Sequence, residues 1–257
     1  MKYIIVALAL TLITNLNAGW LDMAEDLIKE EVIPQETSSL DSMQDDALKA
    51  ALEQGVEYAV KTLGKKDGYL NDKKAKINLP ENIQNMESII RKSGGDEMVD
   101  NLVLSMNSAA TQAAPKTTKV FFSAIKKMTI SDAQKILKSD EDALTQYFQK
   151  HTNTELEQEI EPIVKEMMDK NQVSYYYKQV RSYYEENSDA IPYKDSLSSL
   201  GKSYGLDSYI PPKNLDAYVT KKAIIGLFVK IQEEEKKIRD NPLVQKTKLI
   251  RDVFGSI

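Results

Sequence analysis

The chain has 257 residues, with 34 basic and 39 acidic side chains, one histidine and no cysteine. The absence of cysteine excludes disulfides, a lipid-modified cysteine, thiolate metal sites and thiol nucleophiles. A net charge of −5 disfavours nucleic-acid binders and polybasic membrane-surface proteins, because both depend on an excess of Lys and Arg.

The first residues follow the pattern of a cleavable secretory signal peptide. Lys2 precedes an uncharged, mostly apolar run over residues 4–16, and small residues follow at 17–19. This run is shorter than the roughly 20 apolar residues that a membrane-spanning helix requires, which disfavours a retained anchor. We therefore expect cleavage near Ala18, a periplasmic or secreted mature chain with a net charge of −6, and no transmembrane span in that chain.

Residues 19–44 are predicted to form a separate N-terminal arm. Trp20, Ala24 and Leu27 recur on one side of a helix, and Pro34 is expected to end that helix. A flexible lead-in is the alternative, since chain termini are commonly loose unless they dock on the body.

Residues 45–257 are predicted to form one all-α domain, an irregular multi-helix bundle. Apolar residues recur in adjacent pairs four apart, as they do on the buried face of an amphipathic helix. The pattern predicts helices over 45–63, 81–92 and 98–114, and a new helix beginning at Pro115. Residues 68–80 contain turn-forming residues and predict an extended connection or, at most, one short β-hairpin.

The second half of this domain is expected to contain short helices at 131–138 and 141–150. A longer helix begins at Thr152 or Asn153 in this interpretation, and Pro162 kinks or breaks it. After a long connection over 188–213, Asn214 is the expected cap of the last major helix. That helix is apolar nearly all round from residue 217 to 231, so it is predicted to be the buried C-terminal helix.

Several segments together resemble a known bacterial family. They are MNSAATQAAPK (106–116), AIKKMTISDAQKIL (124–137), DALTQYFQKHT (142–152) and LDAYVTKKAIIGLFVKIQEEEKKIRDNP (215–242). The chain is similar to the DUF4197 family over roughly residues 45–255. The resemblance implies a leader peptide and a helical envelope protein, and it implies no established activity or cofactor. The family pattern has Arg and Glu where this chain has Ser108 and Thr111, so a site built on that charged pair is absent here.

Polar residues inside otherwise apolar helices are the candidate binding residues, because buried polar groups require partners. Such residues either fix the register of the helices or line a pocket. In the run 233–239, Glu235 and Arg239 have the i, i+4 spacing of a solvent-exposed ion pair, and Arg239 lies at a helix end where it can hold a neighbouring segment. The candidates from the resemblance and from this run are Asn107, Asp132, Thr145, Tyr147, Tyr218, Thr220 and Arg239.

No catalytic residue, metal site or cofactor is predicted. His151 is the only histidine and is expected to be exposed or capping. The acidic run 139–142 is expected to stabilise a helix start, where the helix dipole favours negative charge. Tyr176 and Tyr183 are seven apart and share a helix face, which is more typical of core packing than of a sugar platform.

Three functions fit these observations. The first is a non-catalytic exported protein that binds an envelope protein partner or an apolar ligand between its helices. The alternative is a carboxylate-based hydrolase that acts on cell-envelope polymers. The third is a chaperone-like module that uses residues 19–44 to contact membranes or partners.

Overall fold

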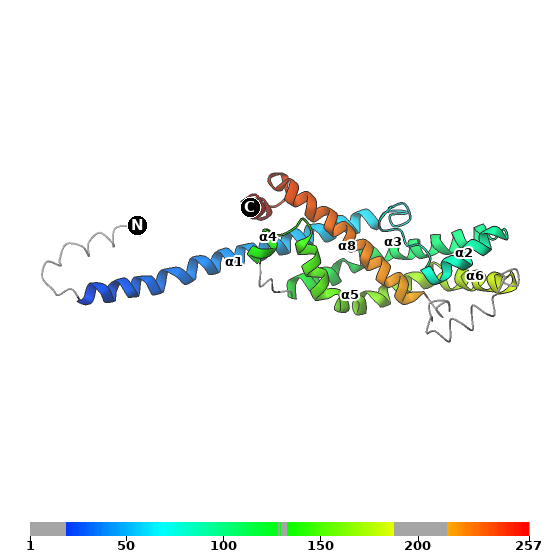
Figure 1. Ribbon diagram of the computed structural model, residues 1–257, viewed down its shortest axis with the longest axis horizontal. Coiled ribbons are helices and arrows are strands. Elements are labelled where there is room, and N and C mark those ends of the chain that lie inside the picture. The colour runs from blue at the N-terminus through cyan, green and yellow to red at the C-terminus, as the bar shows by residue number, and fades with distance from the viewer. Residues whose placement is uncertain (1–18, 128, 130–132, 188–214, 257) are drawn as a thin grey trace. The chain divides into compact units, whose positions relative to one another are not determined.

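The computed structural model describes residues 19–127, 129, 133–187 and 215–256 (Figure 1). The chain divides into two compact units, Met1–Gln44 and Asp45–Ile257, and the second contains the hydrophobic core. Every regular element in the described residues is helical, which confirms the predicted all-α class. The elements are α1 (Gly19–Leu63), α2 (Glu81–Lys92), α3 (Asp96–Lys127), α4 (Ala133–Leu137), α5 (Ala143–Lys170), α6 (Val173–Asn187), α8 (Asp216–Asp240), the 3-10 helix η3 (Pro242–Val244) and α9 (Lys248–Phe254).

The first helix is longer than the sequence pattern predicts. The expected helix end at Pro34 is wrong, because α1 continues through it to Leu63. A proline removes one hydrogen bond from a helix and clashes with the preceding turn, but the remaining bonds can hold the helix together. The apolar face predicted from Trp20 to Leu27 lies outside the side chains that the structure describes. From residue 45 onward the predicted apolar stripe is confirmed, with Leu48 and Leu52 almost fully buried.

Two other prolines also lie within continuous helices. Pro115 does not begin a new helix but lies inside α3. Pro162 does not break its helix either, and α5 runs without interruption from Ala143, so the helix start expected at Thr152 is wrong. The buried faces of α3 and α5 pack on each other, and this packing stabilises both helices against the local cost of a proline, about 3 kcal/mol.

The core is centred where α3, α5 and α8 meet (Figure 1). Phe121, Phe148 and Phe228 come one from each helix, and their ring centroids lie 5.7–6.2 Å apart in edge-to-face geometry. Helix α6 packs on α3 and α2 beyond this junction. The prediction of a buried C-terminal helix is confirmed, since α8 buries residues on several sides between Val219 and Ile231.

The connection between α1 and α2 contains turns and extended residues, and no strand is assigned within residues 64–80. Of the two forms expected for residues 68–80, the extended connection is correct and the hairpin is not. Helix α2 ends at Lys92 as predicted; two residues later Gly94 has a φ of +89°, which favours glycine, and Gly95 N donates to Ile90 O at 2.8 Å. Asp132, Asn214 and the long connection over 188–213 lie outside the described residues.

Candidate functional site

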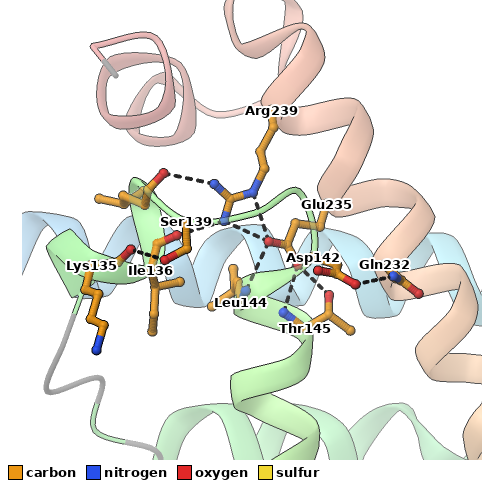
Figure 2. Close-up of polar contacts among 10 residues, drawn as sticks. Lys135, Ile136, Ser139, Asp142, Leu144, Thr145, Gln232, Glu235 and Arg239 are labelled. Carbon is orange, nitrogen blue, oxygen red and sulfur yellow. Dashed lines mark hydrogen bonds and ion pairs between the residues drawn. The ribbon is translucent and has the colours of Figure 1, made fainter.

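A buried carboxylate, Glu235, lies where α8 crosses the start of α5 (Figure 2). Its residue is 3% exposed. Glu235 Oε1 accepts a hydrogen bond from Leu144 N at 3.1 Å, and Oε2 accepts from Thr145 N at 2.8 Å and from the Thr145 hydroxyl at 2.6 Å. The carboxylate therefore binds the free N–H groups in the first turn of α5.

Arg239 lies one turn later on α8 and completes the cluster (Figure 2). Its Nε and Nη2 donate to Glu235 Oε1 at 2.9 and 2.8 Å. The same guanidinium donates from Nη1 to Leu137 O at 3.0 Å and from Nη2 to Ile136 O at 3.1 Å. It also lies 5.6 Å from the ring centroid of Phe254. Arg239 thus binds the last two carbonyl groups of α4, where a helix leaves acceptors without intrahelical partners.

The ion pair therefore caps two helices at once. Helix α4 has five residues, which is too short to be stable in water without contacts to the rest of the protein. With its last carbonyls on Arg239 and the first amides of α5 on Glu235, the turn between α4 and α5 is fixed to α8. We name this arrangement, Thr145, Glu235 and Arg239 with the main chain of residues 136, 137 and 144, the double cap.

One expectation about this region is wrong, and another is only partly met. The predicted Glu235–Arg239 pair is present, but it is buried rather than solvated, because α4 and α5 cover this face of α8. The acidic run 139–142 lies at a helix start as expected, directly before α5, but the side chain of its N-cap residue Asp142 makes no cap hydrogen bond and instead accepts from Gln232 Nε2 at 2.5 Å. The cap comes from a residue 90 positions away along the chain, which no local pattern reveals.

Two candidate residues from different helices hold the same connecting segment. Asn107 on α3 is fully buried; its Nδ2 donates to Ile77 O and Val103 O, both at 2.8 Å, and its Oδ1 accepts from Ile77 N at 2.9 Å. Tyr218 on α8 donates from its hydroxyl to Asn78 O at 2.8 Å. Both side chains satisfy backbone groups that no regular structure pairs.

Tyr69 also holds this connection, and the sequence analysis did not identify it. The residue is fully buried, its hydroxyl donates to Ala223 O at 2.7 Å, and its backbone N–H donates to the hydroxyl of Thr111 at 3.4 Å. Burial raises the pKa of the phenol, so it remains a neutral donor. A Cβ on Gly226 would lie 2.6 Å from the Tyr69 ring, and the glycine in α8 is therefore the signal that a large side chain approaches there.

The other candidates lie apart from the double cap. Tyr147 on α5 donates to Thr129 O at 3.0 Å, and its ring centroid lies 4.3 Å from that of His151, which is exposed as expected. Thr220 on α8 is 3% exposed, and within the described residues its hydroxyl has no hydrogen-bond partner. The structure thus brings Thr145 and Arg239 together at Glu235, and it brings Asn107 and Tyr218 together at residues 77 and 78. Tyr147 and Thr220 lie apart from both sites.

Comparison with known proteins places the chain in a family. A family model described as "Protein of unknown function (DUF4197)" matches residues 39–255. The chain belongs to the DUF4197 family. No curated protein and no solved structure matches this DUF4197 member.

Beside the double cap, the DUF4197 chain has an open surface pocket of about 560 Å³, which we name the α8 pocket. Its walls are Lys74, Ser139, Asp140, Glu141, Asp142, Val229, Gln232, Glu233 and Lys236. Four carboxylates and two ammonium groups give this lining a net charge of −2. The ammonium of Lys74 lies 3.1 Å from Glu233, and that of Lys236 lies 2.5 Å from Glu141.

A second ion-pair network lies under one wall of this pocket. Lys230 is 5% exposed, and its Nζ lies 2.6 Å from Asp72 and 2.9 Å from Glu233. Burial by itself would raise the pKa of both carboxyls, but hydrogen bonds from Lys230 outweigh it, helped by backbone amides at Asp72 and by Lys74 at Glu233, so both pKa values lie below their ordinary range. Burial would lower the pKa of Lys230, and the two carboxylates reverse this and raise it.

Within the described residues no three His, Asp or Glu side chains are placed to hold a metal ion. No helix of the described residues is both long and apolar enough to cross a membrane. Tyr176 and Tyr183 are partly buried and pack against the core, and Tyr183 donates to Ser93 O at 2.6 Å, which agrees with packing rather than a sugar platform.

Proposed function

We propose that this DUF4197 protein acts outside the cytoplasm as a non-catalytic binding protein, and that the α8 pocket receives a partner protein of the cell envelope. The proposal rests on the hydrogen bonds that four of the candidate polar residues make. Asn107, Thr145, Tyr218 and Arg239 each bind the protein's own main chain or side chains. Their hydrogen bonds stabilise the scaffold and leave the α8 pocket as a preformed surface beside it.

The lining of the α8 pocket fits a cationic side chain of the partner. Its net charge is −2, and Val229 offers apolar surface for the aliphatic stem of a Lys or Arg. The exposed pair Lys236–Glu141 is weakly stabilising, so an incoming cation can compete for the carboxylate of Glu141. The double cap fixes the α4–α5 turn, which forms one wall, so binding requires little ordering of the main chain there.

An apolar ligand fits the described surface less well than a protein partner. Apolar ligands occupy enclosed cavities lined mostly by hydrophobic side chains. The α8 pocket is open, and most of the residues that line it are charged. A second open pocket of about 350 Å³, between α2, α3 and the connection before them, contains charged residues such as Arg91 and Asp100 in its lining. Partner recognition by charge and shape is the function that these surfaces support best.

Site-specific photo-crosslinking in an exporting bacterium tests the proposal. A photoreactive residue replaces Ser139 in the pocket wall, and the same residue replaces exposed Tyr175 on α6 as the control. We expect one envelope protein to crosslink from position 139 and not from position 175. Introducing Asp140→Lys should abolish that adduct, because it reverses one pocket charge.

Two results would contradict the proposal. One is an identical set of adducts from both positions, or none from position 139. The other is a protein that N-terminal sequencing finds to retain Met1 in the cytoplasmic fraction, since the proposed site of action requires export and cleavage near Ala18.

The hydrolase alternative has one supporting observation, the four carboxylates around the α8 pocket. A glycosidase-type pair requires one carboxyl with a raised pKa to act as the general acid. Glu233 has a lowered pKa instead, and Asp142 already accepts a hydrogen bond from Gln232. Release of soluble fragments from purified cell wall by the mature protein, lost in both Asp142→Asn and Glu233→Gln, would favour the hydrolase over the binding protein.

A further inference from the structure

Two large aliphatic side chains stand exposed on the surface near the C-terminus. Leu243 is 75% exposed and Val244 is 79% exposed, and they are adjacent in η3, between α8 and α9. Isolated exposed aliphatic residues are ordinary on protein surfaces. Two neighbouring ones at the tip of a turn form a compact apolar projection, which we name the 243–244 tip.

The turn that carries the tip is held rigidly by hydrogen bonds at both of its ends. Gln245 Nε2 donates to Asn241 O at 2.8 Å, and Gln54 Nε2 on α1 donates to Gln245 Oε1 at 2.8 Å. Arg251 Nη1 on α9 donates to Gln245 O at 2.6 Å and to Lys246 O at 3.2 Å. A turn fixed from three helices presents its apolar residues without the entropic cost of ordering them on binding.

The charges of the chain are divided unevenly along its length. Residues 19–44 carry seven acidic side chains and one basic side chain, whereas residues 45–257 carry 32 of each. The whole net charge of the mature chain, −6, therefore belongs to its first 26 residues. Residues 241–257, which contain the 243–244 tip, carry three basic side chains and one acidic side chain and are the complementary region.

The basic residues next to the tip are accessible to such an acidic segment. The side chains of Lys246 and Lys248 are 73% and 80% exposed. Lys246 lies 3.6 Å from Glu57, and Lys248 pairs with Asp252. Exposed pairs of this kind contribute little stability, so a further carboxylate can approach both ammonium groups.

We propose that the 243–244 tip and its flanking lysines receive the acidic segment 19–44 of a second copy of this chain. The segment is helical in its main chain as the first part of α1, and its sequence places Trp20, Ala24 and Leu27 at helical spacing among the acidic residues. An amphipathic acidic helix offers both apolar contact for the tip and carboxylates for the lysines. An anionic lipid surface would attract the lysines but would repel the acidic segment of the same chain, so it fits this protein less well than the segment does. This self-association is independent of the partner proposed for the α8 pocket.

Sedimentation equilibrium of the mature chain tests the proposal. We expect concentration-dependent self-association that weakens at high salt, because charged groups contribute to it. The double variant Leu243→Ser with Val244→Ser should raise the dissociation constant at least about 100-fold, the effect of withdrawing two buried aliphatic side chains. The control is Leu104→Ser, which removes an exposed leucine on α3 and should leave self-association unchanged. All these residues are exposed, so far-UV circular dichroism should show an intact fold.

A charge swap identifies the segment that binds the tip. Lys246→Glu with Lys248→Glu should weaken self-association, and adding Glu30→Lys with Glu31→Lys to that variant should restore it. A mature chain that stays monomeric overturns the proposal, as does self-association that survives the loss of Leu243 and Val244. Failure of the swap to restore it overturns the assignment of residues 19–44. Binding of a monomer to anionic vesicles through the tip would instead identify a lipid-binding turn.

Discussion

Removing the carboxylate of Glu235 is the sharpest test of the double cap. Glu235→Ala leaves the guanidinium of Arg239 without its charged partner at a site where the arginine side chain is 10% exposed. The same change leaves the amides of Leu144 and Thr145 without an acceptor at the start of α5. The variant therefore combines an uncompensated buried charge with a lost helix cap.

The size of the effect follows from these contacts. Breaking a buried ion pair by removing one partner costs about 3–5 kcal/mol. The loss of the N-cap accounts for about 1 kcal/mol of this total. Arg239 retains its bonds to Ile136 O and Leu137 O, which limits the loss. We expect the free energy of unfolding to fall by about 3–4 kcal/mol, a large part of the 5–15 kcal/mol typical of a folded domain.

Urea denaturation followed by far-UV circular dichroism measures this loss. Glu166→Ala is the matched control, because Glu166 pairs with Lys170 at the same i, i+4 spacing on the exposed face of α5. The control should leave the urea midpoint unchanged. Native-state hydrogen exchange adds a local reading, in which the amides of Leu144 and Thr145 lose protection in Glu235→Ala beyond the change in the core helices.

A double-mutant cycle that combines Glu235→Ala with Arg239→Ala measures the interaction between these two side chains apart from their other contacts. We expect a coupling energy of about 2 kcal/mol or more between the two side chains. A loss below about 1 kcal/mol in Glu235→Ala, together with unchanged exchange at Leu144 and Thr145, would refute the view that this pair organises the α4–α5 turn.

Three further outcomes follow from the other buried polar groups. Asn107→Ala should lower the free energy of unfolding by about 2–4 kcal/mol in the same urea assay, since it leaves backbone groups of a connecting segment buried and unpaired; a neutral variant would contradict that role. Tyr69→Phe should cost about 1 kcal/mol, because it removes one buried hydrogen bond and keeps the ring, whereas a loss as large as that of Asn107→Ala would indicate a wider rearrangement. The lowered pKa values of Asp72 and Glu233 contribute stability at pH values above 3.8 and 4.5, the ordinary pKa values of these groups. This contribution is lost as the pH falls through the lower pKa values of the folded state. The raised pKa of Lys230 contributes stability at pH values below 10.5, its ordinary value, and this contribution is lost as the pH rises through the higher folded value. The urea midpoint of Lys230→Met should therefore depend less on pH than that of the unsubstituted protein, both in acid and in alkali. Equal pH profiles of the two proteins would contradict the network.

Within the candidate site, the sequence predicted which side chains take part better than it predicted whether they are buried. Arg239 was expected to hold a neighbouring segment, and it does so through two carbonyl groups of α4. Glu235 was assigned to a solvated face because an i, i+4 pair of opposite charges is usually exposed. Whether such a pair is buried depends on what packs over it, and here the covering segment is 90 residues away in the chain.

The sequence by itself determined the helical class, the apolar stripe of α1 from residue 45, the burial of α8, the end of α2 at Lys92 before Gly94 and the membership of DUF4197. These features depend on local periodicity, on backbone conformations that favour glycine, or on many matched positions along the chain. Tertiary structure alone decided that α3 and α5 continue through their prolines, because packing outweighs a local cost of about 3 kcal/mol. It also decided where the buried polar groups find their distant partners. The bonds from Glu235 to α5, from Arg239 to α4 and between Asn107 and Ile77 join segments far apart in sequence, and only the folded chain brings these donors and acceptors within 3.1 Å.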